Sequence, residues 1–450
     1  MLYAMDDRAG PHLPSPADVL ALRSARRRLE QVVPCRHSAE QLWPYITQVE
    51  EYNRASGASP VEYEILPTPE SASIIRATSR KIGMAMRYQE LPYEWQEPRF
   101  VHGELCFESG PFRYGRIRGE YLEDRAAVRY IVDYVPRQRF GIAGLLARHI
   151  LKTFVAIVRG IDERLPETFA DPIGVKGFED RSAAALQRGR ELADRWRHLA
   201  PDAVVADTVA EFIATAPDRF VGRMRPYALA QQLGTSRDET LLFCLRAARA
   251  GLLTPSWDLI CPSCGGAKRR RRTLAELGDT AHCEVCNIRY DADLARNVEL
   301  SFRPVAAVRA LDEREYCLQS PSHQRLILVQ VNIEPGATAR LTLSLRPGHY
   351  RLRCIGREGE AMFDASYGRP RQTATIDVGG GVPRMDAACG SEVELFVKNG
   401  SAHWRTVRFE RHGYREDAAS AADVLASTQL RDTIGGERGL AEYLTGLRVP

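Results

Sequence analysis

The sequence predicts a multidomain α+β protein, and three stretches of the chain support this fold class. Residues 29–166 contain a helix, a series of short strands and a long second helix. Residues 203–296 combine helical patterns with two Cys-x-x-Cys pairs. Residues 297–415 alternate apolar and polar positions between Gly- and Pro-rich turns. A length of 450 residues is consistent with several domains.

The composition is that of an ordinary globular protein and gives little support to a nucleic-acid or membrane function. Hydrophobic residues make up 44% and charged residues 27% of the chain. The net charge of +4 is small for this length, whereas nucleic-acid binders concentrate basic charge on one face. The most apolar window, Phe140–Val158, is interrupted by Arg148, His149 and Lys152, so we expect no membrane span. No apolar signal segment is visible, and the cysteines outside the two pairs read as reduced thiols, so a cytoplasmic location is expected.

The first predicted domain, residues 29–166, follows a polar stretch, residues 1–28, that is expected to be a disordered tail. Ser38 and Gln41 form a capping box, which predicts a helix after Ser38. Residues 142–165 carry apolar side chains at helical spacing, and this helix is expected to cover one face of an antiparallel sheet. The expected strands are Val61–Leu66, Ala72–Thr78, Ala85–Leu91, Arg99–Glu108, Phe112–Glu123 and Ala126–Val135.

This order of elements resembles the START-like, or helix-grip, superfamily, also called the polyketide cyclase/dehydrase-like group. The resemblance is carried by the run Val-Pro-Cys-Arg-His-Ser-Ala-Glu-Gln-Leu-Trp-Pro-Tyr-Ile that ends at Ile46, by Pro92–Pro98 and by Ser109–Phe112. It implies a cavity between the curved sheet and the last helix that holds a small apolar molecule. The alternative is a cavity filled by side chains. The candidate lining residues are Phe107, Phe112, Tyr114, Tyr130, Phe154 and Val158.

A helical connector, residues 167–202, and a helical unit, residues 203–257, are expected next. Gly234 at a turn and Ser236 as the cap of a following helix form a helix-turn-helix pattern. The exit of the second helix, Arg249–Leu253, resembles that of a winged helix, so a winged-helix-like unit is predicted.

DNA binding by this unit would use Arg237, Arg246 and Arg249. However, Asp238 and Glu239 begin the helix that would read the DNA, where negative charge faces phosphate unfavourably. The same acids suit a helix N-terminus in a scaffold or interaction module, which we favour.

The strongest motif consists of the pairs Cys261/Cys264 and Cys283/Cys286, in a predicted ribbon at residues 258–296. Their spacing is that of a four-cysteine zinc site. Four thiolates close a tetrahedron around Zn²⁺ and leave no position for water or substrate, so the predicted role is structural. The alternative is a set of disulfides or unrelated thiols.

Five basic residues lie between the two cysteine pairs and are expected in a loop or hairpin tip of the ribbon. They could contact a phosphate backbone, but no aromatic residue is interleaved for base stacking, so a solvated loop is the preferred interpretation. These residues are Lys268, Arg269, Arg270, Arg271 and Arg272.

Residues 297–415 are predicted to form an antiparallel β-sandwich, followed by a C-terminal linker at residues 416–450. The expected strands are Val298–Phe302, Leu326–Ile333, Arg340–Leu345, His349–Ile355, Thr373–Val378, Glu392–Lys398 and Trp404–Arg411.

Residues from about 200 to 440 resemble the uncharacterised regulatory region upstream of class III adenylate/guanylate cyclase domains in bacteria. The resemblance implies a regulatory module with a small apolar ligand and a cyclase or other signalling domain, in cis or in trans, as partner. A class III cyclase needs a Phe-Thr-Asp-like run for its metal ions. That run is absent, so this chain is not expected to make cyclic nucleotide. The carrying segments are Ala250–Trp257, Cys261–Gly265, His282–Cys286, Val298–Pro304, Asp312–Tyr316 and Leu345–Arg353.

Two other functions are weighed against this leading hypothesis. The first is a zinc-containing winged-helix DNA-binding regulator, which would use the five basic residues. The second is an enzyme of the cyclase/dehydrase kind, which would need a polar side chain in the cavity, such as Tyr114, His102 or Glu104.

Overall fold

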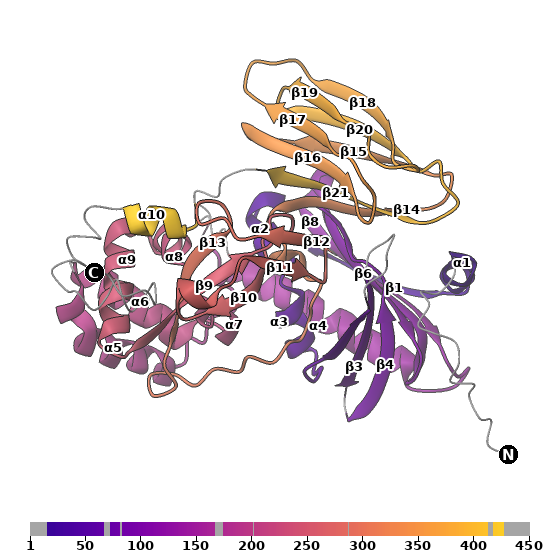
Figure 1. The fold of residues 1–450 in the computed structure, drawn as a ribbon. Helices are drawn as coiled ribbons and strands as arrows, with labels where there is room; N and C mark the ends of the chain where they lie inside the picture. The colour runs from indigo at the N-terminus through magenta and orange to yellow at the C-terminus, as the bar shows by residue number, and fades with distance from the viewer. Residues whose placement is uncertain are drawn as a thin grey trace. The chain divides into compact units, whose positions relative to one another are not determined.

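The computed structural model describes residues 16–66, 73–81, 83–166, 174–200, 202–286, 288–412 and 417–426. The chain divides into two compact units (Figure 1). The first unit comprises Met1–Glu167, Glu284–Asn287 and Glu315–His412, and the second comprises Thr168–Cys283, Ile288–Arg314 and Gly413–Pro450.

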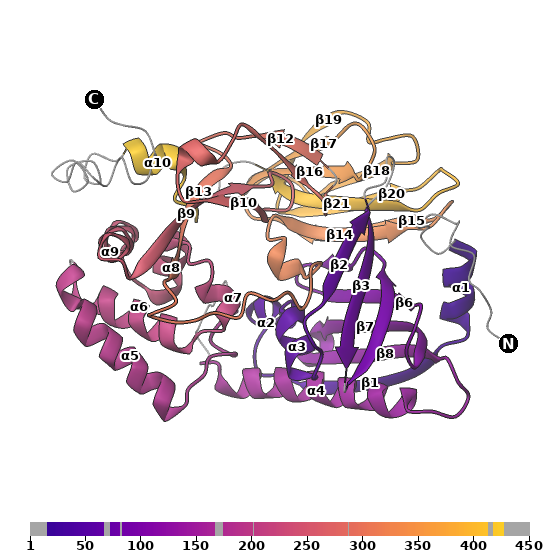
Figure 2. The same cartoon turned by 60° about the horizontal axis from the view of Figure 1, so that its bottom comes forward.

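The N-terminal part of the first unit is a curved antiparallel sheet that holds a long helix, α4. The strands pair in the order β2-β3-β4-β6-β7-β8-β1, and α4 packs on β8 and β1 (Figure 2). This is the helix-grip arrangement, so the prediction of a START-like domain is confirmed at the level of the fold. The elements are β1 (Arg27–Pro34), α2 (Ala39–Ile46), α3 (Val49–Ala55), β2 (Glu62–Leu66), β3 (Ile74–Lys81), β4 (Met84–Glu90), β5 (Glu94–Gln96), β6 (Phe100–Phe107), β7 (Phe112–Leu122), β8 (Ala127–Pro136) and α4 (Ala143–Arg164).

Local sequence explains these helices. The capping box of α2 is present, since the Ser38 side chain accepts from the backbone N–H of Gln41 and the Gln41 side chain accepts from that of Ser38. In α4 the buried residues include Ile150, Phe154 and Val158, which recur every four positions and form one apolar stripe.

The predicted tail is only partly correct, because a helix α1 (Pro16–Ser24) precedes β1. Residues 1–15 lie outside the described residues. Val19 and Leu22 of α1 pack with Leu91, Cys106 and Val135 on the sheet face opposite α4. Leu20 lies between them and is 44% exposed, so the apolar residues of α1 do not all face the sheet, and the burial of Val19 and Leu22 depends on a surface that forms only after the sheet has folded.

The sandwich is formed by two sheets, with strand orders β14-β21-β16-β17-β19 and β15-β20-β18. Two pairs, β17/β19 and β18/β20, are parallel, so the prediction of a wholly antiparallel sandwich is wrong. Its core clusters around Tyr350, Leu352, Phe363 and Phe409. The strands are β14 (Ile327–Ile333), β15 (Thr338–Ser344), β16 (Gly348–Cys354), β17 (Ala361–Ala365), β18 (Gln372–Asp377), β19 (Met385–Cys389), β20 (Glu392–Lys398) and β21 (Arg405–His412).

Strand β14 also pairs with β5, which joins one sheet of the sandwich to the helix-grip sheet. Gln330 lies opposite Trp95, and the Trp95 indole N–H donates to the backbone carbonyl of Ile327 at 2.9 Å. The two predicted domains therefore share one 13-stranded sheet and form a single unit.

The second unit packs helices against a small sheet of order β10-β9-β13 (Figure 1). Its core includes Trp196, Phe243, Trp257 and Leu300. The helices are α5 (Ala183–Trp196), α6 (Ala203–Thr215), α7 (Asp218–Val221), α8 (Pro226–Leu233), α9 (Arg237–Arg249) and α10 (Ala421–Ala426). The strands are β9 (Leu253–Ile260), β10 (Ala267–Arg271), β11 (Thr280–Cys283), β12 (Ile288–Asp291) and β13 (Val298–Pro304).

The structure refines two boundaries in this part of the chain. Strand β13 pairs with β9, so residues 298–304 do not belong to the predicted sandwich of residues 297–415. The predicted linker of residues 416–450 contains α10, and residues 427–450 lie outside the described residues. The helices α8 and α9 lie where the helix-turn-helix pattern was predicted, with Gly234 in the left-handed region at φ 69°.

In the described part of the chain, no helix has the length and apolar character that a bilayer crossing requires.

Candidate functional site

A cavity of about 130 Å³ lies inside the helix-grip domain, bounded by the sheet, by α2 and α3, and by Ala147, Ile150 and Phe154 of α4. An engineered cavity of about 150 Å³ in another protein binds benzene, so this space suits one six-membered ring. Aromatic rings form a large part of the wall, beside aliphatic side chains such as Val61, Leu105 and Val132. The rings around it include Tyr88, Phe107, Phe112, Tyr130, Tyr134 and Phe154.

Four of the six residues predicted from the sequence line this cavity. Phe107 and Phe112 lie side by side, with ring centroids 5.5 Å apart. Tyr130 and Phe154 meet edge to face, with centroids 5.8 Å apart. These geometries are typical of aromatic pairs that pack tightly. The sheet and α4 thus bring together residues that are far apart in the sequence.

The other two predicted residues, Tyr114 and Val158, are not among the lining residues. Tyr114 is fully buried on the opposite face, where it packs with Val19 and Cys106. The reason is a β-bulge in β7, since Phe112 pairs with Pro136 while Tyr114 pairs with Val135. An extra residue reverses the alternation of a strand, so two positions that a regular pattern places on one face become separated.

The cavity also has a buried carboxyl group, Glu90, that sequence analysis missed. Met86, Tyr88 and Glu90 alternate along β4 and are buried. The side chain of Glu90 is 3% exposed, and the Gln319 amide donates to its Oε2 at 2.9 Å. Burial raises the pKa of Glu90 to about 7, although the hydrogen bond from Gln319 lowers it. The sequence does contain a signal for this site, because Glu90 occupies the same alternating positions of β4 as the apolar residues Met86 and Tyr88.

Two tyrosine hydroxyls satisfy each other at another part of the wall. Tyr130 donates to Tyr52 at 3.0 Å, and the ring of Tyr52 packs edge to face on Phe154. Burial raises the pKa of both phenols, so they stay neutral at physiological pH. This wall is therefore polarisable but uncharged.

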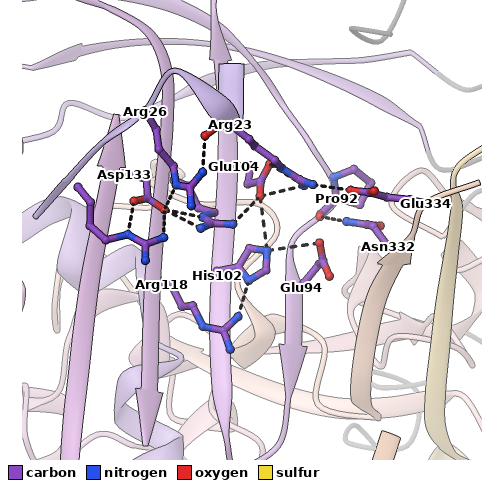
Figure 3. Close-up of polar contacts among 12 residues, drawn as sticks. Arg23, Arg26, Pro92, Glu94, His102, Glu104, Arg118, Asp133, Asn332 and Glu334 are labelled. Atoms are coloured by element: carbon purple, nitrogen blue, oxygen red, sulfur yellow. Dashed lines mark hydrogen bonds and ion pairs between the residues drawn. The ribbon is translucent and has the colours of Figure 1, made fainter. Parts of the chain in front are cut away.

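The face of the sheet opposite the cavity carries a network of charged side chains, shown in Figure 3. Asp133 is fully buried and accepts from Arg28 Nε at 2.8 Å and from Arg116 Nη2 at 2.6 Å. Burial alone would raise the pKa of Asp133, but the bonds from Arg28 and Arg116 hold it below its usual value. Glu104 pairs with Arg23 of α1 at 3.0 Å, so the network also fixes α1 to the sheet (Figure 3).

His102 and Glu104, two of the polar residues considered for catalysis, belong to this network. Along β6, Gly103 and Leu105 border the cavity, and strand alternation places the side chains of His102 and Glu104 on the other face, although His102 is also among the residues that border the cavity. The Nε2 atom of His102 lies 3.3 Å from a Glu94 carboxyl oxygen, and its Nδ1 lies 3.2 Å from Arg118 Nη1 (Figure 3). With Tyr114 also on that face, the catalytic roles considered for these residues are not supported.

The four predicted metal ligands come together. The sulfur atoms of Cys261, Cys264, Cys283 and Cys286 all lie within 4.8 Å of one another, and all four residues are buried. The Cys264 and Cys283 sulfurs are 3.9 Å apart. A tetrahedron with Zn–S bonds of ~2.3 Å has edges of ~3.8 Å, whereas a disulfide bond is ~2.05 Å long. The four cysteines can therefore hold a metal ion such as zinc.

The first cysteine pair is positioned by a tight turn. The backbone N–H of Gly265 donates to the carbonyl of Cys261 at 2.9 Å, and the N–H of Cys261 donates to Gly266 at 2.9 Å. Gly265 has φ 74°, a conformation in which a side chain would be strained. The glycine after the Cys-x-x-Cys pair is thus explained by backbone geometry.

A buried arginine of the sandwich, Arg408 in β21, donates from Nη1 to the sulfur of Cys286 at 2.9 Å. Its Nε donates to Gln330 Oε1 at 2.6 Å, and its side chain is 2% exposed. A guanidinium beside a sulfur stabilises the thiolate that a metal requires. No local pattern around residue 408 indicates this contact, because it joins positions more than a hundred residues apart.

The basic run lies in a strand, so the expectation of a loop is wrong for residues 267–271. Arg269 donates to the backbone carbonyl of Leu277 at 2.9 Å, and Arg270 Nε lies 3.9 Å from a carboxyl oxygen of the buried Asp258. Arg246 of α9 donates to the carbonyl of Leu199 at 3.2 Å. Several proposed DNA contacts thus have internal partners, and DNA binding stays a prediction.

Comparison with known proteins gives limited matches. The model of a "family of unknown function (DUF5939)" matches residues 190–323. No curated protein matches the chain.

Several solved structures are similar to part of the chain. The Zhui aromatase/cyclase from Streptomyces sp. R1128 is 14% identical over 30% of this chain and 94% of its own, with a TM-score of 0.22. The di-domain aromatase/cyclase BexL from the BE-7585A biosynthetic pathway is 12% identical over 33% of this chain and 55% of its own, with a TM-score of 0.24. The major latex-like protein 151 from Panax ginseng is 12% identical over 32% of this chain and 99% of its own, with a TM-score of 0.22. The helix-grip assignment therefore rests on the strand order and the position of α4.

Proposed function

We propose that this protein is a sensory or regulatory module whose helix-grip cavity binds one small, mostly apolar ring compound. The observation that carries the proposal is the cavity of about 130 Å³, which has an aromatic wall and is bounded by both the sheet and α4. Well-packed interiors contain few voids larger than a water molecule. A space that could hold a benzene ring is therefore better explained by a ligand than by incomplete packing.

The size of the cavity limits the affinity. A ligand of about eight non-hydrogen atoms, at roughly 0.5–0.8 kcal/mol per atom, would bind with a Kd between about 10 μM and 1 mM. This range suits a sensor of a metabolite that accumulates, rather than a carrier that holds its ligand permanently.

In this proposal the four cysteines hold Zn²⁺ in a structural role. A site of four thiolates is closed, so the ion would stabilise the ribbon and would not bind substrate. Cys286 would be held as a thiolate by Arg408, which supplies a positive charge at 2.9 Å.

The proposed output is regulation of a cyclase or another signalling domain, in cis or in trans. The support is the sequence resemblance to regions that precede class III cyclase domains. A ligand can change the output only if it binds one arrangement of the module more tightly than another. The chain itself is proposed to have no cyclase activity.

The test is ligand binding by the full chain and by a variant with a filled cavity. Ala147 of α4 borders the cavity and is fully buried, so Ala147→Met should occupy the space. Leu145 of the same helix is 64% exposed, so Leu145→Met is the matched control. Saturation-transfer NMR with toluene and indole should detect binding to the wild type and to Leu145→Met, but not to Ala147→Met. Failure of both compounds to bind wild type at about 5 mM would contradict the proposal, since this exceeds the expected Kd.

A further inference from the structure

Glu90 is a strongly buried carboxyl group in the cavity wall, and it alternates along β4 with Met86 and Tyr88, which also line the cavity. Its ionisable neighbours are Tyr63, Tyr88, Tyr93 and Cys317. The pKa of each of these groups is raised, first by burial, and the charge of Glu90 is among the other causes. All four are therefore neutral near pH 7, and no cation faces Glu90 from this set.

One hydrogen bond is a small compensation for burying this group. The Gln319 amide donates to Oε2 and also to the backbone carbonyl of Leu91 at 3.2 Å, so its two protons are both in use. A carboxylate can accept about four hydrogen bonds, and a buried carboxylate without enough donors is costly. A glutamine at position 90 could accept from Gln319 without that cost. Structural stability therefore does not explain a carboxylate at the edge of an otherwise apolar space, and ligand binding is the alternative explanation.

We infer that Glu90 recognises a hydrogen-bond donor on the ligand, so that the ligand is a ring of about benzene size bearing one hydroxyl or amino group. This inference rests on the proposed function and specifies the chemistry of the same cavity. The ligand ring packs against the aromatic side chains of the wall, and the Glu90 carboxyl accepts a hydrogen bond from the donor group. A group that donates to a charged acceptor gains more than one that donates to a neutral acceptor, so Glu90 discriminates against plain hydrocarbons.

The experiment uses three ligands with the same number of non-hydrogen atoms: ethylbenzene, benzyl alcohol and benzylamine. Their Kd values are measured by NMR titration of the full chain for wild type, Glu90→Met and Glu90→Gln. Glu90→Met removes the polar atoms at similar length, and Glu90→Gln removes only the charge. Glu108→Gln is the control, since Glu108 follows β6 and does not line the cavity.

We expect Glu90→Met to raise the Kd of benzyl alcohol or benzylamine by about tenfold or more, and that of ethylbenzene by less than about twofold. Glu90→Gln should weaken the binding of benzylamine, which is a cation at neutral pH, more than that of benzyl alcohol, because this change removes only the charge of residue 90. Equal effects of Glu90→Met on all three ligands would overturn the inference and leave the proposed function intact. If none of the three binds to wild type, the proposed function fails as well.

A second measurement covers the case in which the variants do not fold. In wild type, the affinity for benzylamine should rise between pH 6 and pH 8 as Glu90 ionises, while the affinity for ethylbenzene stays constant. The affinity for benzyl alcohol should also rise between pH 6 and pH 8, but by a smaller factor. Affinities for both donor ligands that are independent of pH, together with no preference over ethylbenzene, would overturn the inference.

Discussion

Removing the guanidinium of Arg408 should weaken metal binding without unfolding the chain. Arg408→Met keeps a long side chain in β21 but deletes the donor that lies 2.9 Å from the Cys286 sulfur. A hydrogen bond to a charged group contributes about 1.5–3 kcal/mol, which corresponds to a factor of about 10 to 150 in affinity. Partners that orient metal ligands in other proteins typically contribute 10–100-fold. We therefore expect the zinc Kd to rise by about 10- to 100-fold.

The assay is competition for Zn²⁺ between the full chain and a chromophoric chelator of known affinity. The control is Arg351→Met, because Arg351 is a largely buried arginine on β16, the strand that pairs with β21. Arg351 forms ion pairs with Glu410 and Glu360. Its loss should lower the stability of the sandwich and leave the zinc Kd within about twofold of wild type.

Two results would refute this reasoning. A folded Arg408→Met protein with an unchanged zinc Kd would mean that the Cys286 thiolate does not depend on the guanidinium. An equal loss of affinity in Arg351→Met would mean that the effect comes from general loosening of the sandwich. Circular dichroism and urea unfolding of both variants separate these cases from loss of the fold.

Three further changes test the helix-grip domain. Asp133→Asn should lower the free energy of unfolding in urea by about 3–5 kcal/mol, because three arginines including Arg28 lose a buried counter-charge; a loss below about 1 kcal/mol would contradict this. Burial raises the pKa of Glu90 to about 7, so wild type should lose stability as pH rises from about 4.5 to 7, and Glu90→Gln should not. The free energy of unfolding of Glu90→Gln, compared with that of wild type, should therefore rise by up to about 3 kcal/mol from pH 4 to pH 8. A difference between the urea midpoints of the two proteins that does not change with pH would argue against burial of the ionised carboxyl. Gly103→Ala would place a Cβ 2.6 Å from the Tyr93 ring, so we expect it to destabilise the fold by about 1–3 kcal/mol. A Tm that is unchanged within error would contradict this packing.

Periodicity and capping predicted most of the helix-grip domain, because its signals are local. The capping box at Ser38 and the apolar stripe of residues 142–165 each fix a helix without reference to distant residues. The cysteine spacing had the same advantage, since each Cys-x-x-Cys pair forms its own turn. Four of the six predicted lining residues border the cavity, because alternation along β6 and β8 places Phe107 and Tyr130 on one face and the apolar stripe of α4 carries Phe154.

What the sequence could not predict depends on contacts between distant segments. Tyr114 was assigned to the wrong face because a bulge is invisible in a pattern of alternating residues. Strand β13 was assigned to the sandwich because its composition does not reveal that its partner is β9. Arg408 looked like any polar residue of a strand, and its burial follows from partners at positions 286 and 330.

These distant contacts also connect the cavity to the cysteine at position 286 within the first unit. Gln319 donates to Glu90, and the Gln324 amide donates to the backbone carbonyl of Gln319 at 3.2 Å. Arg408 Nη2 then donates to Gln324 Oε1 at 3.5 Å, and its Nη1 donates to Cys286. All five residues are buried, so the charges at the two ends are weakly screened by water.

A polar chain of this kind has consequences for the proposed sensor. A donor ligand at Glu90 would favour the carboxylate, and the added charge would orient Gln319 more firmly toward the cavity. Any resulting shift at Gln324 changes how strongly Arg408 holds the thiolate of Cys286, and the coupling must be the same in both directions. Such coupling requires that ligand and metal both favour one of two arrangements. The weakest link is the 3.5 Å contact between Arg408 and Gln324, so it is the point where two arrangements would differ most easily.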